Sequence, residues 1–180
     1  MIIPGINLVK RKHVILMICG TILLVVSYIP AFAQEKPPKP FTITAATLQN
    51  INFGTFCISS NGSGSVIIYP DGSRLCSGNI IPVNSTTSAL RYEVVATLGT
   101  LITIVGQHLT LTGSNGGTIG LDIGDSYPHS PFIATGIPTG VDGTLVKIQV
   151  TIGGTLTVAG SGDYPPGNYG ASFDVTFNQQ

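Results

Sequence analysis

Gly124-Asp-Ser126 is the triplet of this chain with the most direct link to catalysis. One class of esterases uses Gly-Asp-Ser as a nucleophile turn, which needs an α/β fold to present the serine and a downstream Asp-x-x-His to supply the base. The chain has no Asp-x-x-His, no helix is indicated here, and His129 follows in a proline-rich stretch. The triplet is therefore predicted to be a loop, and no catalytic residue is assigned.

Acidic and histidine side chains are the other candidates for chemistry. Asp122 and Asp125, with Asp142 further on, carry oxygens that suit Ca²⁺, but their spacing matches no calcium loop. His108 and His129 have no third ligand at a spacing typical of zinc sites. The sequence therefore predicts neither a metal site nor a cofactor site.

Tyrosines give the chain one way to bind a ligand, because aromatic rings stack on sugars. A carbohydrate- or ligand-binding module is the alternative function, and Tyr127 and Tyr164 lying together beside Asp122 or Asp125 would favour it. The tyrosines are spread along the chain, which is more typical of core edges and turns: Tyr69, Tyr92, Tyr127, Tyr164 and Tyr169.

Composition excludes several classes of protein. Only 9% of the 180 residues are charged and 43% are hydrophobic, with 23 Gly and 12 Pro. Coiled coils and helical bundles are rich in Ala, Glu, Lys, Leu and Arg, and nucleic-acid binders carry a basic patch. The apolar fraction is too high for a disordered chain. An all-β protein that binds no nucleic acid is the class that remains.

The first 33 residues have the three parts of a signal peptide. A basic cluster at 10–12 precedes an apolar run from residue 14, and Ala31-Phe-Ala33 provides a cleavage site. The run of about 15 residues is shorter than the ~20 that span a bilayer, although a membrane anchor is the alternative. We expect a helical signal peptide over 1–33, a proline-rich leader over 34–40, and an exported protein without a membrane span after cleavage. Periplasm, cell surface and extracellular space are the expected locations.

Cleavage would leave two cysteines, Cys57 and Cys76. In an exported protein such a pair is typical of a disulfide. Closing a ~20-residue loop would stabilise the fold by about 3 kcal/mol in the chain-entropy model. Two free buried thiols are the alternative.

The chain after residue 40 reads as short strands separated by turns. Pro70-Asp-Gly72 predicts a hairpin turn, Gly153-Gly154 predicts a second one, and residues 124–143 are expected to be mostly loop. Together these strands predict a single antiparallel β-sandwich over 41–180, immunoglobulin-like or pilin-like. The strands are expected at 41–45, 48–54 (a second strand or a bulged continuation of the first), 66–69, 74–76, 90–98, 101–105, 108–112, 118–123, 145–152, 155–158 and 168–177.

Both ends of the predicted domain alternate between apolar and polar residues. Phe41, Ile43 and Ala45 share one face near the start, where they could form a strand donated to another molecule. A terminal strand exposes a row of backbone donors, so it must dock in a sheet of its own chain or of a partner. The predicted strand-docking residues near the C-terminus are Tyr169, Ala171, Phe173, Val175 and Phe177.

A family resemblance rests on five pieces of sequence. They are Ile51-Asn-Phe-Gly54, Tyr69-Pro-Asp-Gly72, Gly154-Thr-Leu-Thr-Val158, Pro166-Gly-Asn-Tyr169 and Phe173-Asp-Val-Thr-Phe177. This frame resembles an exported bacterial family known as domain of unknown function 4402. The ending is also similar to that of spore-coat-U-type pilins, except that Phe177-Asn178 stands where such pilins usually place a tyrosine. The resemblance implies an exported β-sandwich, carries no catalytic residues, and does not include the two cysteines.

The predicted function is therefore a secreted structural or adhesive surface protein rather than an enzyme. We expect a fimbria-like subunit that assembles by strand complementation, with like subunits or a periplasmic chaperone as partners.

Overall fold

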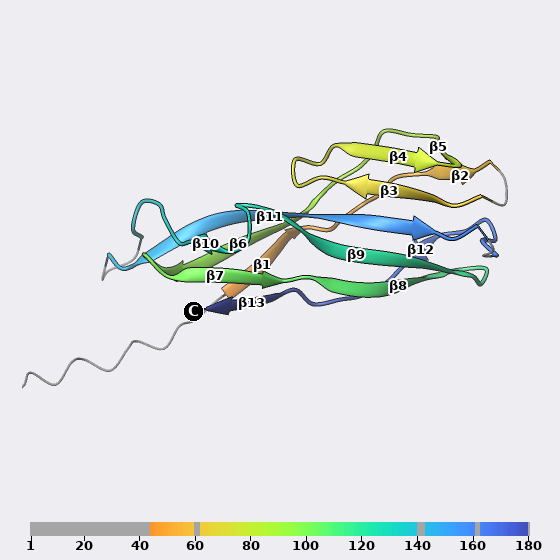
Figure 1. The fold of residues 1–180 in the computed structure, drawn as a ribbon. Coiled ribbons are helices and arrows are strands. Elements are labelled where there is room, and N and C mark those ends of the chain that lie inside the picture. The colour runs from red at the N-terminus through yellow and green to blue at the C-terminus, as the bar shows by residue number, and fades with distance from the viewer. Residues whose placement is uncertain (1–43, 60–61, 140–142, 161–162, 180) are drawn as a thin grey trace, which may run out of the picture. The chain divides into compact units, whose positions relative to one another are not determined.

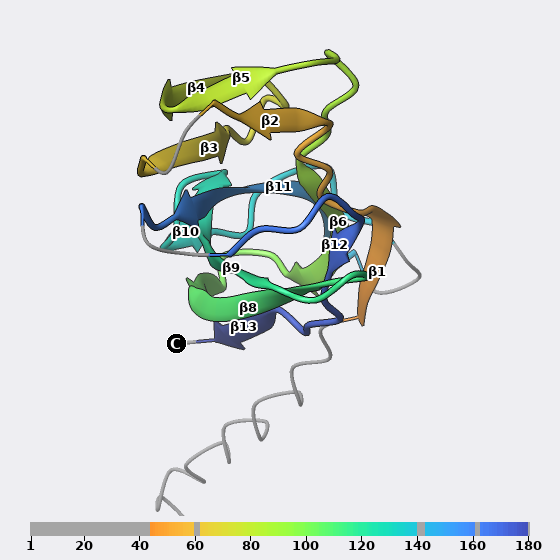
Figure 2. The same ribbon diagram turned by 90° about the vertical axis from the view of Figure 1, so that its right-hand side faces the viewer.

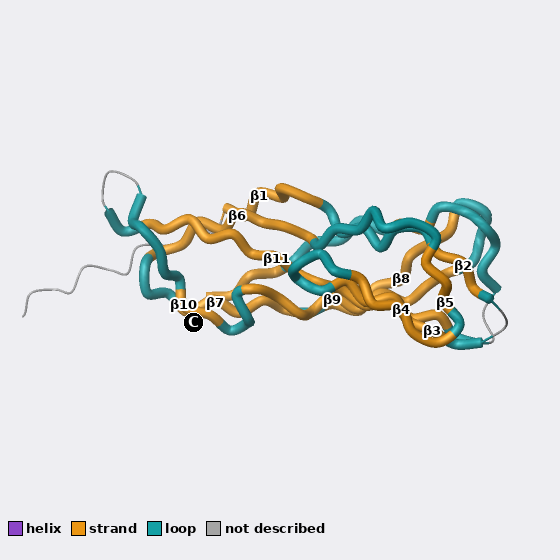
Figure 3. The backbone as a smooth tube through the Cα atoms, turned by 90° about the horizontal axis from the view of Figure 1, so that it is seen from above, coloured by secondary structure: helices purple, strands orange, loops and turns teal. Residues whose placement is uncertain are grey.

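The computed structural model describes residues 44–59, 62–139, 143–160 and 163–179. These residues form strands and loops without a helix, and the named strands all pair antiparallel, so the predicted all-β antiparallel fold is confirmed (Figure 3). The predicted signal peptide, the leader over 34–40 and residues 41–43 lie outside the described residues. In the described part of the chain, no helix has the length and apolar character to cross a bilayer.

The main sheet follows the order β1-β6-β11-β9-β8-β12, and the hairpin of β3 and β4 joins it through β11 (Figure 1). Its members are β1 (Thr44–Gln49), β3 (Gly64–Ile68), β4 (Arg74–Gly78), β6 (Leu90–Thr97), β8 (Gln107–Gly113), β9 (Thr118–Tyr127), β11 (Leu145–Val158) and β12 (Tyr169–Gly170).

The remaining strands form two smaller sheets. One has the order β10-β7-β13, from β10 (Phe132–Ile133), β7 (Leu101–Val105) and β13 (Thr176–Gln179), and the other pairs β2 (Phe56–Ile58) with β5 (Ile80–Pro82).

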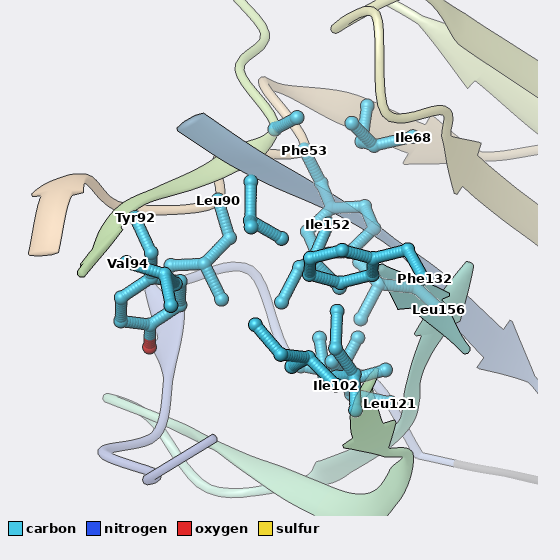
Figure 4. Close-up of a cluster of buried hydrophobic side chains, with 14 of the residues drawn as sticks. Phe53, Ile68, Leu90, Tyr92, Val94, Ile102, Leu121, Phe132, Ile152 and Leu156 are labelled. Carbon is cyan, nitrogen blue, oxygen red and sulfur yellow. The ribbon is translucent and has the colours of Figure 1, made fainter. Parts of the chain in front are cut away.

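A single core joins the main sheet to the sheet of β7, β10 and β13 (Figures 2 and 4). Alternate residues of each strand point inward, because side chains change face at every step of a strand. Ile102 of β7 and Phe132 of β10 are buried with Leu121, Ile152 and Leu156 of the main sheet. The two sheets therefore pack face to face as the two layers of a sandwich.

Strand β11 overturns one prediction, because Gly153-Gly154 is not a hairpin turn. The strand continues through both glycines, with a register shift between Ile152 and Gly154. Its first half pairs with β6 and its second half with β3. A Cβ atom at Gly153 would lie 2.3 Å from the carbonyl oxygen of Ile68. Glycine is needed here for the close approach of β3, and a local turn is not formed.

The first predicted hairpin is confirmed between β3 and β4. Gly72 has a φ of +85°, a backbone conformation that favours glycine. Asp71 Oδ1 accepts hydrogen bonds from the Ser73 hydroxyl and the Ser73 backbone N–H, at 2.6 and 2.8 Å. The hydroxyl bond, followed by the backbone bond, lowers the pKa of Asp71.

The predicted loop over 124–143 is only partly correct. Strand β9 continues to Tyr127, where the expected strand stopped at residue 123, and Phe132 and Ile133 form the short strand β10. Ser126 pairs with Ile152 of β11 and is only 4% exposed. The Gly-Asp-Ser triplet is therefore part of strand β9, although the sequence predicted a loop here.

The chain changes sheet between β7 and β8. These strands are separated only by Gly106, where a Cβ atom would lie 2.9 Å from the carbonyl oxygen of Ile123. The C-terminal segment makes the same change, because β12 pairs with β8 and β13 pairs with β7. The expected single strand over 168–177 is therefore two short strands, with residues 171–175 crossing the corner between them.

The predicted disulfide is not formed in this structure, where both cysteines are free. Cys57 is the exposed middle residue of β2, whose neighbours Phe56 and Ile58 face inward. Cys76 belongs to the inward face of β4 and packs against the core. The two thiols lie on faces of opposite exposure, in strands that do not pair with each other.

Candidate functional site

A cleft of about 960 Å³ opens between the two edge strands of the main sheet, β1 and β12. One wall is the connection from β1 to β2, over residues 50–58. The other wall is the C-terminal segment over residues 164–173. In Figure 2 these two stretches of chain run beside β1 and β12, on the side where the sheet order does not close.

The floor of the cleft is the hydrophobic core itself. Leu111 of β8, Ile119 and Leu121 of β9, and Leu156 of β11 line it, each no more than 7% exposed. Register explains why they meet, since Leu111 lies opposite Ile119 and Leu121 lies opposite Leu156. An occupant of the cleft would therefore contact core side chains of three adjacent strands.

Arg74 holds the wall over residues 50–58. Its guanidinium donates hydrogen bonds to the carbonyl oxygen of Phe53, at 3.1 Å, and to that of Asn84. Asn84 Oδ1 in turn accepts from the backbone N–H of Thr55 at 2.9 Å. Asn52 Oδ1 accepts from the backbone N–H of Gly54, also at 2.9 Å. These side chains hold the irregular part of the wall, whereas its last three residues pair with β5 and Asn52 bridges to Ser88 through the backbone.

Two tyrosines fix the C-terminal wall. The hydroxyl of Tyr164 accepts from the Ala159 backbone N–H at 2.7 Å and donates to the Ala159 carbonyl oxygen at 3.0 Å. The hydroxyl of Tyr169 donates to the carbonyl oxygen of Pro165 at 2.8 Å. Desolvation, with a smaller contribution from the Asp163 carboxylate, raises the pKa of Tyr169. Both hydroxyls therefore hydrogen-bond to nearby backbone groups and stabilise the conformation of this wall.

The described residues that line the cleft include no Asp, Glu, Lys, Arg or His. Their polar groups are amides, hydroxyls and backbone, as in Asn50, Asn52 and Asn168, and aromatic rings such as Phe56 and Phe173 lie between them. Phosphate and other strongly charged ligands are bound by charged groups or by helix termini. The cleft instead suits an uncharged occupant with apolar groups and its own hydrogen-bonding backbone.

The predicted strand-docking residues fall into two groups. Tyr169, Ala171 and Phe173 line the cleft. Val175 and Phe177 lie beyond it, where they pack against the core, and Phe177 contacts Tyr92. The predicted alternation is retained, since four of the five residues are half-buried; Ala171 is exposed.

The residues considered for chemistry remain apart from the cleft. His108 Nδ1 lies 2.6 Å from Asp122 Oδ1 across β8 and β9, and His129 Nδ1 lies 3.5 Å from Asp125 Oδ1, all with exposed side chains. Asp142 lies outside the described residues. No group of three or more potential metal ligands occurs in the described part of the chain.

Ser126 is engaged in the turn that follows β9. Its hydroxyl donates to the carbonyl oxygen of Pro128 at 2.9 Å and accepts from the backbone N–H of Ser130 at 3.2 Å. Both bonds stay within the turn, and His129 contacts Asp125 rather than this serine. The triplet therefore lacks the serine–histidine contact that nucleophilic catalysis requires.

Tyr127 and Tyr164, whose proximity would favour the ligand-binding alternative, do not lie together. Tyr127 lies opposite Thr151 near the middle of β11, whereas Tyr164 is bonded to Ala159 just beyond the end of that strand. Eight residues of extended chain separate these points, on the order of 25 Å. Tyr127 is 72% exposed and is not part of the cleft.

The wall over residues 50–58 is the part of the site that the sequence did not predict. Residues 48–54 were expected to form a second strand or a bulged continuation of the first. Strand β1 has a register irregularity between Thr47 and Gln49 and ends at Gln49. The Asn52-Phe-Gly54 sequence carries a signal for an irregular wall, because an asparagine two residues before a glycine favours a turn.

A family model described as "Domain of unknown function (DUF4402)" matches residues 41–178, a range that includes β1 and all of β13 except Gln179. The chain belongs to this family. The predicted family resemblance is therefore confirmed, and the match includes both walls and the floor of the cleft in this DUF4402 domain. Comparisons with curated proteins and with solved structures gave no match. The similarity of its ending to pilins stays a prediction.

Proposed function

We propose that this chain is a structural subunit of an exported surface assembly, and that its cleft accepts a β-strand from another molecule. The observation that carries the proposal is the uncharged cleft, because it lies between the two edges of the main sheet and reaches the core. An added strand would hydrogen-bond through its backbone and place alternate side chains on the floor. No catalytic role is part of the proposal.

Export is proposed from the N-terminal sequence. The basic cluster at 10–12, the apolar run that follows and Ala31-Phe-Ala33 support it. The chain is poor in charged residues, so unpaired strand edges would favour self-association. Strand complementation would use that property for controlled assembly, with like subunits or a periplasmic chaperone as partners.

The test is the assembly state of the full chain, produced in an export-competent bacterial host. We expect oligomers or filaments in light scattering and negative-stain microscopy. Ala171→Asp puts a charge on an exposed residue that lines the cleft and should abolish assembly. Asn178→Asp makes a comparable change on an exposed position outside the cleft and should leave assembly intact. A wild-type chain that stays monomeric at high concentration and purifies without a chaperone would overturn the proposal.

A carbohydrate-binding module is the second candidate. One observation favours it, since the aromatic rings of Tyr164 and Phe173 line the same cleft as the amide of Asn168. Hydroxyl-rich sugars are bound by such combinations of rings and amides. A glycan-array signal that Ala171→Asp removes, from a chain that does not assemble, would favour this module over the subunit.

A further inference from the structure

We infer that the strand which fills the cleft comes from residues 41–43 of a second copy of this chain. The inference rests on the proposed function and names the donor. Three observations carry it: the direction of β1, the reach of the residues before it, and the absence of charge in the cleft.

Strand β1 enters the sheet at the end that lies away from the cleft. Thr44 is opposite Val95 of β6, and Gln49 is opposite Arg91. The cleft is lined by Leu90 and Tyr92 of β6, and by the connection that leaves β1 at its Gln49 end. The chain before Thr44 therefore begins at the opposite end of the strand from the cleft.

In a hairpin that returns along β1, the apolar residues of this segment would not lie beside the cleft of their own chain. Phe41 and Ile43 lie within about 10 Å of Thr44, because three extended residues span no more than that. A tight hairpin back along β1 would place Phe41 beside Thr44. Only residues 34–38 would then reach Thr47, where the cleft begins.

Residues 34–38 are a poor match for the cleft. They include Glu35, Lys36, Pro37 and Pro38. Charges lose hydration in a cleft without opposite charges, and proline has no N–H to donate to an edge strand. A chain that fills its own cleft would therefore insert its least suitable residues.

Residues 41–43 of another copy have the chemistry that the cleft requires. Phe-Thr-Ile is uncharged and has N–H and C=O groups at each position. In a strand, Phe41 and Ile43 point to the same side and would meet Leu121 and Leu156 on the floor, while Thr42 points away. This is β-strand addition with side-chain register.

Donation between copies has a geometric consequence. Each copy would give its N-terminal segment and receive one in its cleft, so the interface joins two different surfaces. Such heterologous interfaces produce rings or open filaments rather than closed two-fold dimers. The inference therefore predicts rings or filaments that form without a second protein component.

The test places a photo-crosslinking amino acid at position 41 of the full chain, with ¹⁴N- and ¹⁵N-labelled copies mixed before irradiation. We expect crosslinked dimers of mixed label, with attachment to residues 50–58 or 164–173. Attachment within one copy, to another surface or to a co-purified chaperone would overturn the assignment of the donor.

Variants separate this inference from the proposed function. Phe41→Asp combined with Ile43→Asp should abolish assembly, whereas Thr42→Asp, which alters the opposite face, should preserve it. If the double variant still assembles and Ala171→Asp does not, the donor is wrong but the cleft function stands. If the wild-type chain and all variants remain monomeric, the proposed function fails, and this inference fails with it.

Discussion

The rings of Tyr92 in β6 and Phe177 in β13 meet edge to face, with centroids 5.4 Å apart and planes 80° apart. The contact joins the main sheet to the smaller sheet that contains β13. Tyr92 also lines the cleft, so a residue of the cleft lining is in direct contact with strand β13. Edge-to-face pairs contribute about 0.5–1.5 kcal/mol beyond the burial of their area.

Phe177→Ala should lower the free energy of unfolding by about 2–3 kcal/mol, because it removes both the ring pair and apolar burial. Urea unfolding followed by circular dichroism measures the change. Asn178→Ala alters the neighbouring exposed residue and should change stability by less than about 0.5 kcal/mol. Equal effects of the two substitutions would contradict the role of the ring.

Gly153→Ala should destabilise the fold by about 3 kcal/mol, because the added Cβ meets the backbone of Ile68. Gly124 lies in neighbouring β9 and has open space where its Cβ would be. Gly124→Ala is therefore the matched control and should leave the melting temperature unchanged or slightly raised. If the two variants have the same melting temperature, β3 does not approach β11 as closely as described.

The two turns predicted from the sequence show where sequence analysis succeeds and where it fails. The Pro70-Asp-Gly72 turn was predictable because its geometry depends on neighbouring residues. Gly153-Gly154 has equal turn character locally, yet β3, β6 and β9 hold it in one long strand. Local patterns indicate strands and their inward faces, but they do not show which distant strand will pair.

The cleft illustrates the same limit. The alternation that ends in Phe177 indicated the half-buried residues of the C-terminal segment, with the exception of Ala171, which is exposed. The opposite wall depends on Arg74, which binds the carbonyl oxygen of Phe53 from 21 positions away. Nothing in either local sequence indicates that contact. The disulfide expected from the spacing is not formed in this structure, and spacing does not reveal the face on which each cysteine lies.

Stability should decrease in strongly alkaline solution, and Tyr92 should contribute to the decrease. Burial raises the pKa of Tyr92 above its ordinary value of 10.0, the nearby Asp174 carboxylate adds to this, and a hydrogen bond with Thr47 opposes it. The unfolded chain then loses the phenolic proton at lower pH than the folded chain. The stabilising contribution is therefore full below pH 10 and is lost as pH rises through the folded-state pKa.

The measurement is urea unfolding between about pH 9 and pH 11. In Tyr92→Phe the free energy of unfolding should fall less steeply with pH than in the wild type. Tyr127→Phe makes the same chemical change on a ring that is 72% exposed, and should keep the wild-type slope. Parallel slopes in all three proteins would refute the contribution of Tyr92.

Cys57 should react with iodoacetamide faster than Cys76 in the folded protein. Cys57 is exposed on β2, whereas Cys76 is half-buried against the core. Peptide mass spectrometry after timed labelling distinguishes the two sites, and unfolding in urea should make their rates similar. If neither cysteine is labelled until a reductant is added, the two are joined as a disulfide, contrary to the structure.

The C-terminal segment pairs along β8 and β7 in succession, so both sheets depend on its residues. During synthesis, neither sheet has its full set of strands until residues 169–179 have left the ribosome. A polypeptide shortened before residue 169 would have lost one border of the cleft together with the outer strand of the small sheet. The native state of this domain is therefore reached only after β12 and β13 have been synthesised.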